Sequence, residues 1–313
     1  MKTILPIAFG VFLVWYSYYN TSPEDREQIL FYIKEADLFW VGVSVLLGIL
    51  SHISRAVRWN YLLEPLGYRP KLSNNILIIL MAYFANLGIP RTGEILRATA
   101  LTTYEGVPFE KGFGTIVTER VVDVIMLLII IALTLFLQTD IILGFFQERG
   151  FDFNGLLLLS LAGLLASAFF YFFIKRSKHP FAQKIKGFVK GLLDGVFSIF
   201  KMKNKWAFIL HTLFIWACYI GMLWVIKFTV PETMDLSLSE LMVAFVAGTF
   251  AMATTNGGIG LYPIAVSKAL AIFGISAVSG DAFGWIMWIS QTLMIVVFGA
   301  ISFLILPLWN RNR

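Results

Sequence analysis

The sequence has little charge for its length. Only 14% of its 313 residues are charged, whereas 58% are hydrophobic. Soluble domains carry about 25% charged residues, so a soluble chain of this composition would need an unusually large apolar core. We therefore predict an all-α polytopic membrane protein in which residues 1–313 form a single integral membrane domain.

Cysteine and histidine are also scarce. Cys218 has no second cysteine with which to form an internal disulfide, and it lies in an apolar run, which is typical of a packed apolar residue. His52, His179 and His211 lie far apart and lack the spacing of zinc ligands. We interpret His52 as a packed or interfacial residue. We expect no metal and no cofactor.

The net charge of +6 is typical of a membrane protein whose cytoplasmic loops face anionic lipid. The sequence lacks the basic stripe with interleaved aromatic residues that would indicate nucleic-acid binding. Residues 55–71 form a predicted basic loop that contains Arg55 and Arg58, with Trp59 and Tyr61 as anchors at the membrane interface.

Apolar runs predict about six full transmembrane helices. They cover residues 4–19, 38–54, 113–137, 156–174, 206–226 and 282–306. The first run lacks a small-residue cleavage site, so we interpret it as a retained span rather than a signal peptide. In the lysine-rich segment 175–205, apolar residues recur at helical spacing. This spacing predicts a cytoplasmic amphipathic linker helix at about 181–202, with a solvated linker helix as the alternative.

Loop charge predicts the topology. The basic loops and the C-terminus are assigned to the cytoplasm, and the acidic loops at 20–37, 138–154 and 230–240 to the outside. The N-terminus is then cytoplasmic as well. With these assignments, segments 73–112 and 241–280 must each leave the membrane on the side where they enter.

Both segments are therefore predicted to be re-entrant hairpins that open to opposite sides. The halves at about 1–140 and 155–308 then form an inverted-topology repeat, an arrangement typical of transporters. The alternative is an eight-helix bundle in which Pro90 and residues 257–260 produce kinks.

Ionisable residues follow the break in the first hairpin. Pro90 interrupts a helix because it lacks a backbone donor, and Arg91, Glu94 and Arg97 come next. Charged residues at membrane depth mark functional sites by default, and arginine suits the geometry of phosphate. We predict that Arg91 and Arg97 bind a lipid phosphate, with Glu94 holding them or carrying a proton. A self-contained ion-pair cluster is the alternative.

Two further groups accompany this break. Glu119, Arg120 and Asp123 begin the next span, where Arg120 and Asp123 can pair at i,i+3. Glycines in the second hairpin let the backbone approach closely and expose N–H groups. Lys268 either reaches the outer interface or binds substrate.

These motifs occur in an order that resembles a known family. Arg58-Trp59 precedes Asn86, Pro-Arg-x-Gly-Glu at 90–94, Glu-Arg-x-x-Asp at 119–123 and Gly-Gly-Ile-Gly at 257–260. The chain resembles, over nearly its whole length, the flippase-like membrane region of lysylphosphatidylglycerol synthases. The resemblance implies translocation of a phospholipid or polyprenyl-linked lipid. The predicted substrate-binding residues are Arg91, Glu94, Arg97, Arg58, Asn86, Asn256, Gly257, Gly258 and Gly260, with coupling or structural ion pairs at Glu119, Arg120 and Asp123.

The second glycine motif departs from the family pattern. Asn256 stands where the family has proline, and Tyr262-Pro263 stands where an acid is expected. The aminoacyl-transferring domain of the synthases is absent from this sequence.

We predict a lipid flippase rather than an enzyme, located in a bacterial cytoplasmic membrane. The alternatives are a lipid-modifying or glycosyl-transferring enzyme, or an accessory subunit of one. Its expected partners are anionic membrane lipids, with a second copy of the chain or a glycosyltransferase as further candidates.

Overall fold

The computed structural model describes residues 4–89, 92–141 and 202–311, together with isolated residues between 142 and 201. The predicted span 156–174 and the predicted linker helix 181–202 lie almost entirely outside the described residues. The chain divides into two compact units, Met1–Glu119 with Asn204–Arg313, and Arg120–Lys203. The regular elements in the described ranges are helices.

Four helices in the described part are long and apolar enough to cross a membrane. They are α3 (Leu38–Leu63), α6 (Phe109–Leu137), α10 (Lys205–Ile226) and α13 (Ala277–Trp309). Each contains one of the predicted runs. A fifth apolar helix, α1 (Ile4–Asn20), covers the first run with 17 residues. These helices are those of a multi-pass membrane protein.

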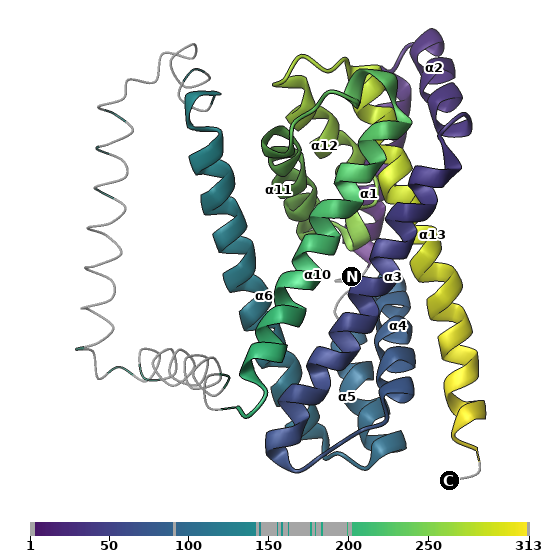
Figure 1. Ribbon diagram of the computed structural model, residues 1–313. Helices are drawn as coiled ribbons and strands as arrows, with labels where there is room; N and C mark the ends of the chain where they lie inside the picture. The colour runs from purple at the N-terminus through teal and green to yellow at the C-terminus, as the bar shows by residue number, and fades with distance from the viewer. Residues whose placement is uncertain are drawn as a thin grey trace. The chain divides into compact units, whose positions relative to one another are not determined.

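Both predicted hairpin segments form pairs of short helices. In the first, α4 (Leu72–Gly88) is followed by α5 (Thr92–Glu105). In the second, α11 (Leu238–Thr254) leads through the short helix η4 (Asn256–Gly258) to α12 (Leu261–Ala271). Figure 1 shows α4 and α5 beside one end of α3 and α10, and α11 and α12 beside the other end. The helices therefore end where the sequence predicted breaks.

The two helix pairs meet at their breaks. The Asn256 side-chain amide donates a hydrogen bond to the carbonyl of Leu87 at 2.6 Å, and the Trp288 indole donates to the carbonyl of Gly257 at 2.8 Å. Gly257, Gly258 and Gly260 all have positive φ angles. A side chain at these positions would strain the backbone, so the second break depends on glycine.

Two segments that were predicted to be loops contain helix, so these two predictions were wrong. The acidic segment at 20–37 contains the helix α2 (Pro23–Lys34), and the predicted basic loop at 55–71 begins within α3. Arg55, Arg58 and Trp59 are buried residues of α3 and do not lie in a loop. The sequence interpretation ended the span at its first arginine because charge in a membrane is costly. The fold offsets that cost by pairing, as described below.

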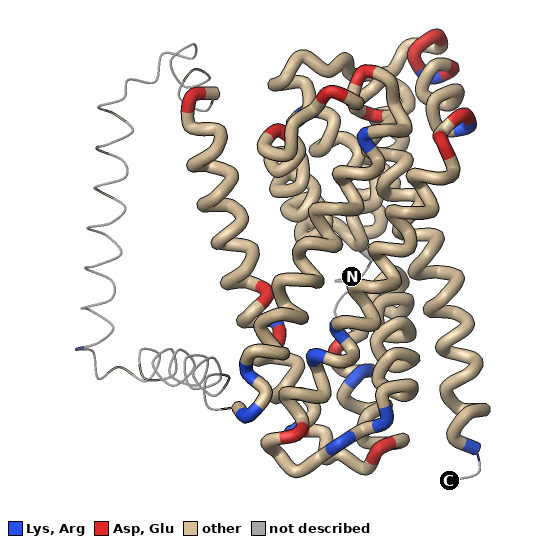
Figure 2. Tube along the Cα trace, in the orientation of Figure 1, with Lys and Arg blue, Asp and Glu red and all other residues tan. Residues whose placement is uncertain are grey.

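Charge is unevenly distributed along the first unit. Figure 2 shows lysine and arginine concentrated towards the end that contains α4 and α5, with acidic residues gathered near α2. The first turn of α2 carries Glu24 and Asp25. The loop before α4 does not include Arg55 and Arg58. It contains two basic residues, Arg69 and Lys71, and one acidic residue, Glu64. The topology derived from loop charge stays a prediction.

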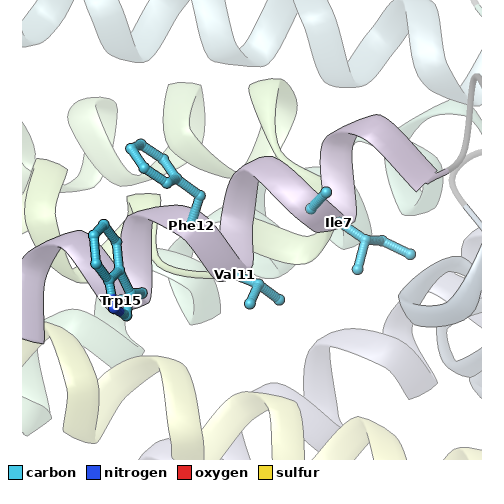
Figure 3. Close-up of a pocket in the computed structure, with 5 residues that line it drawn as sticks. Ile7, Val11, Phe12 and Trp15 are labelled. Carbon is cyan, nitrogen blue, oxygen red and sulfur yellow. The ribbon is translucent and has the colours of Figure 1, made fainter.

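The helix α1 carries an open apolar groove of about 620 Å³ (Figure 3). Its lining residues are Ile7, Ala8, Val11, Phe12 and Trp15. The groove has no ionisable side chain, so its chemistry suits hydrocarbon rather than a charged group. None of its residues belongs to the predicted site.

One carboxylate links two loop segments that lie outside the four long apolar helices. Glu232 accepts hydrogen bonds from the backbone amide and the hydroxyl of Ser276, which is the N-cap of α13. Hydrogen bonds from the side chains of Ser276 and Ser279 hold the pKa of Glu232 below its ordinary value. A lowered pKa stabilises the folded state above the pKa of the unfolded chain, and this contribution is lost as pH falls through the folded value.

We therefore expect acid to destabilise the wild type more than Glu232→Gln, because only the wild type has this carboxylate to protonate. Thermal unfolding of both proteins in detergent at pH 7 and pH 4 measures the difference. Asp235→Gln is the control at an exposed acid nearby. An equal loss of stability in all three proteins would show that the Glu232 contact contributes nothing.

Candidate functional site

Three arginines contact a single carboxylate inside the first unit. The Arg97 Nη2 atom lies 2.8 Å from Oε2 of Glu119, and the Arg58 Nη2 atom lies 3.2 Å from Oε1. Arg55 donates a further hydrogen bond to Oε1. We call these four residues the arginine cluster. Because α3, α5 and α6 supply its members, the cluster joins the first helix pair to two long helices.

Helix geometry explains how these residues converge. Arg55 and Arg58 are three positions apart on α3, so they share one face. Arg97 lies five residues after Thr92, the first residue of α5, about 7.5 Å along the helix axis. Glu119 lies ten residues after Phe109, about 15 Å into α6, rather than in the first turns as the sequence predicted.

The cluster is removed from solvent. Arg58 and Glu119 are 0% exposed, and Arg55 and Arg97 are each 2% exposed. A buried ion pair needs good geometry and further hydrogen bonds to offset the loss of hydration. Guanidinium is less strongly hydrated than ammonium and presents a planar set of donors, which suits such a position.

Neighbouring side chains supply these further contacts. The Arg55 Nη2 atom donates to the Tyr219 hydroxyl at 3.1 Å, and Arg58 Nη1 donates to the Thr212 hydroxyl at 3.1 Å. The Arg97 guanidinium lies 4.1 Å from the ring centre of Trp59, a cation–π contact. Together these contacts fix the directions in which the guanidinium groups point.

The structure brings together only part of the predicted site. Arg58, Arg97 and Glu119 converge, whereas Arg91 lies outside the described residues. Glu94 is partly buried on α5, one turn before Arg97. Asn86 accepts a hydrogen bond from the Gly93 amide at 2.7 Å, which fastens α5 to α4.

The other predicted residues lie elsewhere. Asn256 binds the carbonyl of Leu87 at the meeting point of the two helix pairs, where Gly257, Gly258 and Gly260 shape the backbone. Arg120 and Asp123 belong to the second unit, where their side chains lie 3.6 Å apart at the i,i+3 spacing.

Several residues at the cluster were missed from the sequence. Arg55 was assigned to a loop. Tyr219, Thr212 and Thr115 lie in apolar runs, where no pattern in the sequence marks them as site residues. Thr115 accepts a hydrogen bond from the Trp59 indole at 2.9 Å, which orients the ring beneath Arg97. The i,i+3 spacing of Arg55 and Arg58 is the one signal that could have placed both on one helix face.

The arrangement is suited to binding an anion. Guanidinium groups bind carboxylate and phosphate in the same bidentate manner, so Glu119 occupies a position that a phosphate could also take. Among the described residues, no group of three or more histidine, cysteine, aspartate or glutamate side chains could hold a metal ion.

Two curated proteins resemble part of the chain. The UPF0104 membrane protein MJ1595 of Methanocaldococcus jannaschii is 33% identical over 124 residues, which cover 39% of this chain and 34% of that protein. The glycosyltransferase AglD of Haloferax volcanii is 28% identical over 102 residues, which cover 32% of this chain and 16% of that protein. The matches thus span about a third or less of these relatives. No solved structure matches the chain significantly.

The family comparison covers far more of the sequence. The family described as the lysylphosphatidylglycerol synthase TM region matches residues 3–305. That range includes the arginine cluster, both pairs of short helices, three of the four long apolar helices and all but the last four residues of α13. This chain belongs to the lysylphosphatidylglycerol synthase TM region family.

Proposed function

We propose that this protein is a flippase that binds the phosphate of an anionic membrane lipid at the arginine cluster and moves the lipid across the bilayer. The observation that carries the proposal is the convergence of Arg55, Arg58 and Arg97 on Glu119, where two helices of membrane length, α3 and α6, meet the short helix α5. Buried ionisable residues of this kind mark substrate or ion pathways in membrane proteins.

Glu119 provides a means of release. A lipid phosphate that enters the cluster competes with the Glu119 carboxylate for the same guanidinium donors. When the phosphate leaves, the carboxylate takes its place again, so the arginines keep a counter-ion in both states. Binding and release then cost less than they would if bare charges had to be exposed in the membrane.

The two helix pairs provide a means of alternating access. They lie at opposite ends of α3 and α10 in Figure 1, and they contact each other through Asn256 and Leu87. We propose that both are re-entrant hairpins in an inverted repeat, as in transporters that bind substrate near the middle of the membrane. In this proposal both termini are cytoplasmic.

A second candidate function is suggested by the match to the glycosyltransferase AglD. In this alternative the chain is an accessory membrane module that presents a polyprenyl-linked lipid to a glycosyltransferase. Such lipids also carry phosphate, so the arginine cluster would keep its role. The two functions differ in whether the purified chain moves lipid by itself.

Reconstitution in liposomes tests the proposal. We expect the wild-type protein to move fluorescent phosphatidylglycerol between leaflets faster than phosphatidylcholine. Arg97→Lys should reduce that rate at least tenfold, because lysine keeps the charge but loses the bidentate donors. The readout is the fraction of fluorophore that dithionite quenches over time.

Arg69→Lys is the matched control, because Arg69 forms an exposed ion pair with Glu64 at 2.7 Å. Exposed pairs contribute little, so this variant should transport at the wild-type rate. The proposal fails if the wild type moves no phosphatidylglycerol, or if Arg97→Lys folds and transports as fast as the wild type.

A further inference from the structure

The face of α3 that carries the arginines continues with a histidine. His52 precedes Arg55 by three residues and Arg58 by six, so the three side chains follow one another along neighbouring turns. The rise of an α-helix places His52 about 4.5 Å along the axis from Arg55. The polar face of α3 is therefore longer than the arginine cluster itself.

His52 is buried and lacks a hydrogen bond at one ring nitrogen. The residue is 5% exposed, and among the described residues its Nδ1 atom has no hydrogen-bond partner. Leaving a buried polar atom unpaired is destabilising, so native proteins rarely keep one without a reason such as a bound water, ion or ligand.

The neighbours of His52 place it against the first helix pair. The ring centre of His52 lies 4.4 Å from that of Tyr83, which belongs to α4 five residues before its last residue, Gly88. Tyr83 is only partly buried. The imidazole thus lies between α3 and α4, near the break that precedes Arg97 on α5.

A second histidine provides a contrast. His211 on α10 forms a hydrogen bond between its Nδ1 atom and the hydroxyl of Ser54 at 2.8 Å. The Nδ1 atom of His211 is therefore already occupied by a protein group. His52 and His211 lie on helices that pack together, but only His52 keeps this atom for another partner.

We infer that His52 binds a hydroxyl group of the lipid headgroup whose phosphate lies at the arginine cluster. The inference rests on the proposed function and adds the class of substrate, a phosphodiester lipid with a polyol headgroup such as glycerol or a sugar. A neutral imidazole offers one donor and one acceptor, which matches a hydroxyl group. Headgroups without a hydroxyl cannot make this bond.

Two lipids of equal charge test the inference. Phosphatidylglycerol carries hydroxyl groups, whereas phosphatidylpropanol has the same phosphodiester charge and a headgroup of the same carbon length without them. We expect the full-length wild-type protein in liposomes to move phosphatidylglycerol about tenfold faster, as expected for one buried hydrogen bond. His52→Phe should move both lipids at the slower rate.

His52→Asn should restore much of the preference, because its amide offers a donor and an acceptor near the position of Nδ1. The matched control is His211→Phe, which should keep the preference of the wild type.

The outcomes separate this inference from the proposed function. If the wild type moves neither anionic lipid, the proposed function fails. Equal rates for the two lipids in the wild type overturn the inference alone, and this comparison needs no variant that might misfold. A preference that survives in folded His52→Phe also overturns it.

Discussion

Replacing Glu119 with glutamine is expected to lower the free energy of unfolding by about 3–5 kcal/mol and to abolish lipid transport. The carboxylate contacts Arg55, Arg58 and Arg97 at a position without solvent exposure. Glutamine fills nearly the same volume but carries no charge, so it leaves three guanidinium groups beside a neutral amide. The expected effect is large because removing one partner of a buried ion pair leaves the other charges poorly compensated.

Thermal unfolding in detergent measures the first effect, and the liposome assay measures the second. Glu110→Gln is the matched control, because Glu110 lies exposed in the first turn of the same helix. A surface change of this kind usually alters stability by less than about 0.5 kcal/mol. If Glu119→Gln unfolds at the wild-type temperature, the arginine cluster does not depend on the carboxylate.

Gly93→Ala is expected to separate α5 from α4 and thereby to reduce transport at least tenfold. An added Cβ atom would lie 2.4 Å from the carbonyl oxygen of Ala82 and 2.7 Å from the Asn86 side-chain nitrogen. Side-chain carbons do not approach backbone oxygen so closely, so the helices must move apart. Because Arg97 lies one turn beyond Gly93, the shift also displaces a cluster arginine.

The control lies in the same helix pair. Gly88→Ala would place its Cβ atom in open space, with no heavy atom within 4 Å. Both variants change glycine to alanine and alter the unfolded chain similarly. We expect Gly93→Ala to lose about 1–3 kcal/mol of stability, as overpacked sites do, and Gly88→Ala to stay close to the wild type. Equal behaviour of the two variants would contradict the close packing of α4 and α5.

Local patterns in the sequence identified much of the fold. The length of an apolar run is enough to predict a helix that can cross a membrane. Four such helices are present in the described part. Glycine and proline act on their own backbone, so the breaks after Gly88 and Thr254 could also be predicted from the sequence.

Which residues form the site is decided by contacts between segments that lie far apart in the sequence. Glu119 lies 64 residues from Arg55 and 22 from Arg97 in the sequence. No periodicity within one helix reports such a pairing. The sequence interpretation relied on neighbours such as Glu94 and Arg97, because i,i+3 spacing was the available rule, and this rule gives no information on a distant partner such as Glu119.

The sequence by itself determined that this chain is a helical membrane protein with two interrupted segments, since hydropathy and backbone chemistry are local properties. Only the tertiary structure decided that Arg55 and Arg58 stay inside α3. Their burial is too costly for either residue alone, and it becomes acceptable when α5 and α6 bring Arg97 and Glu119 to the same place.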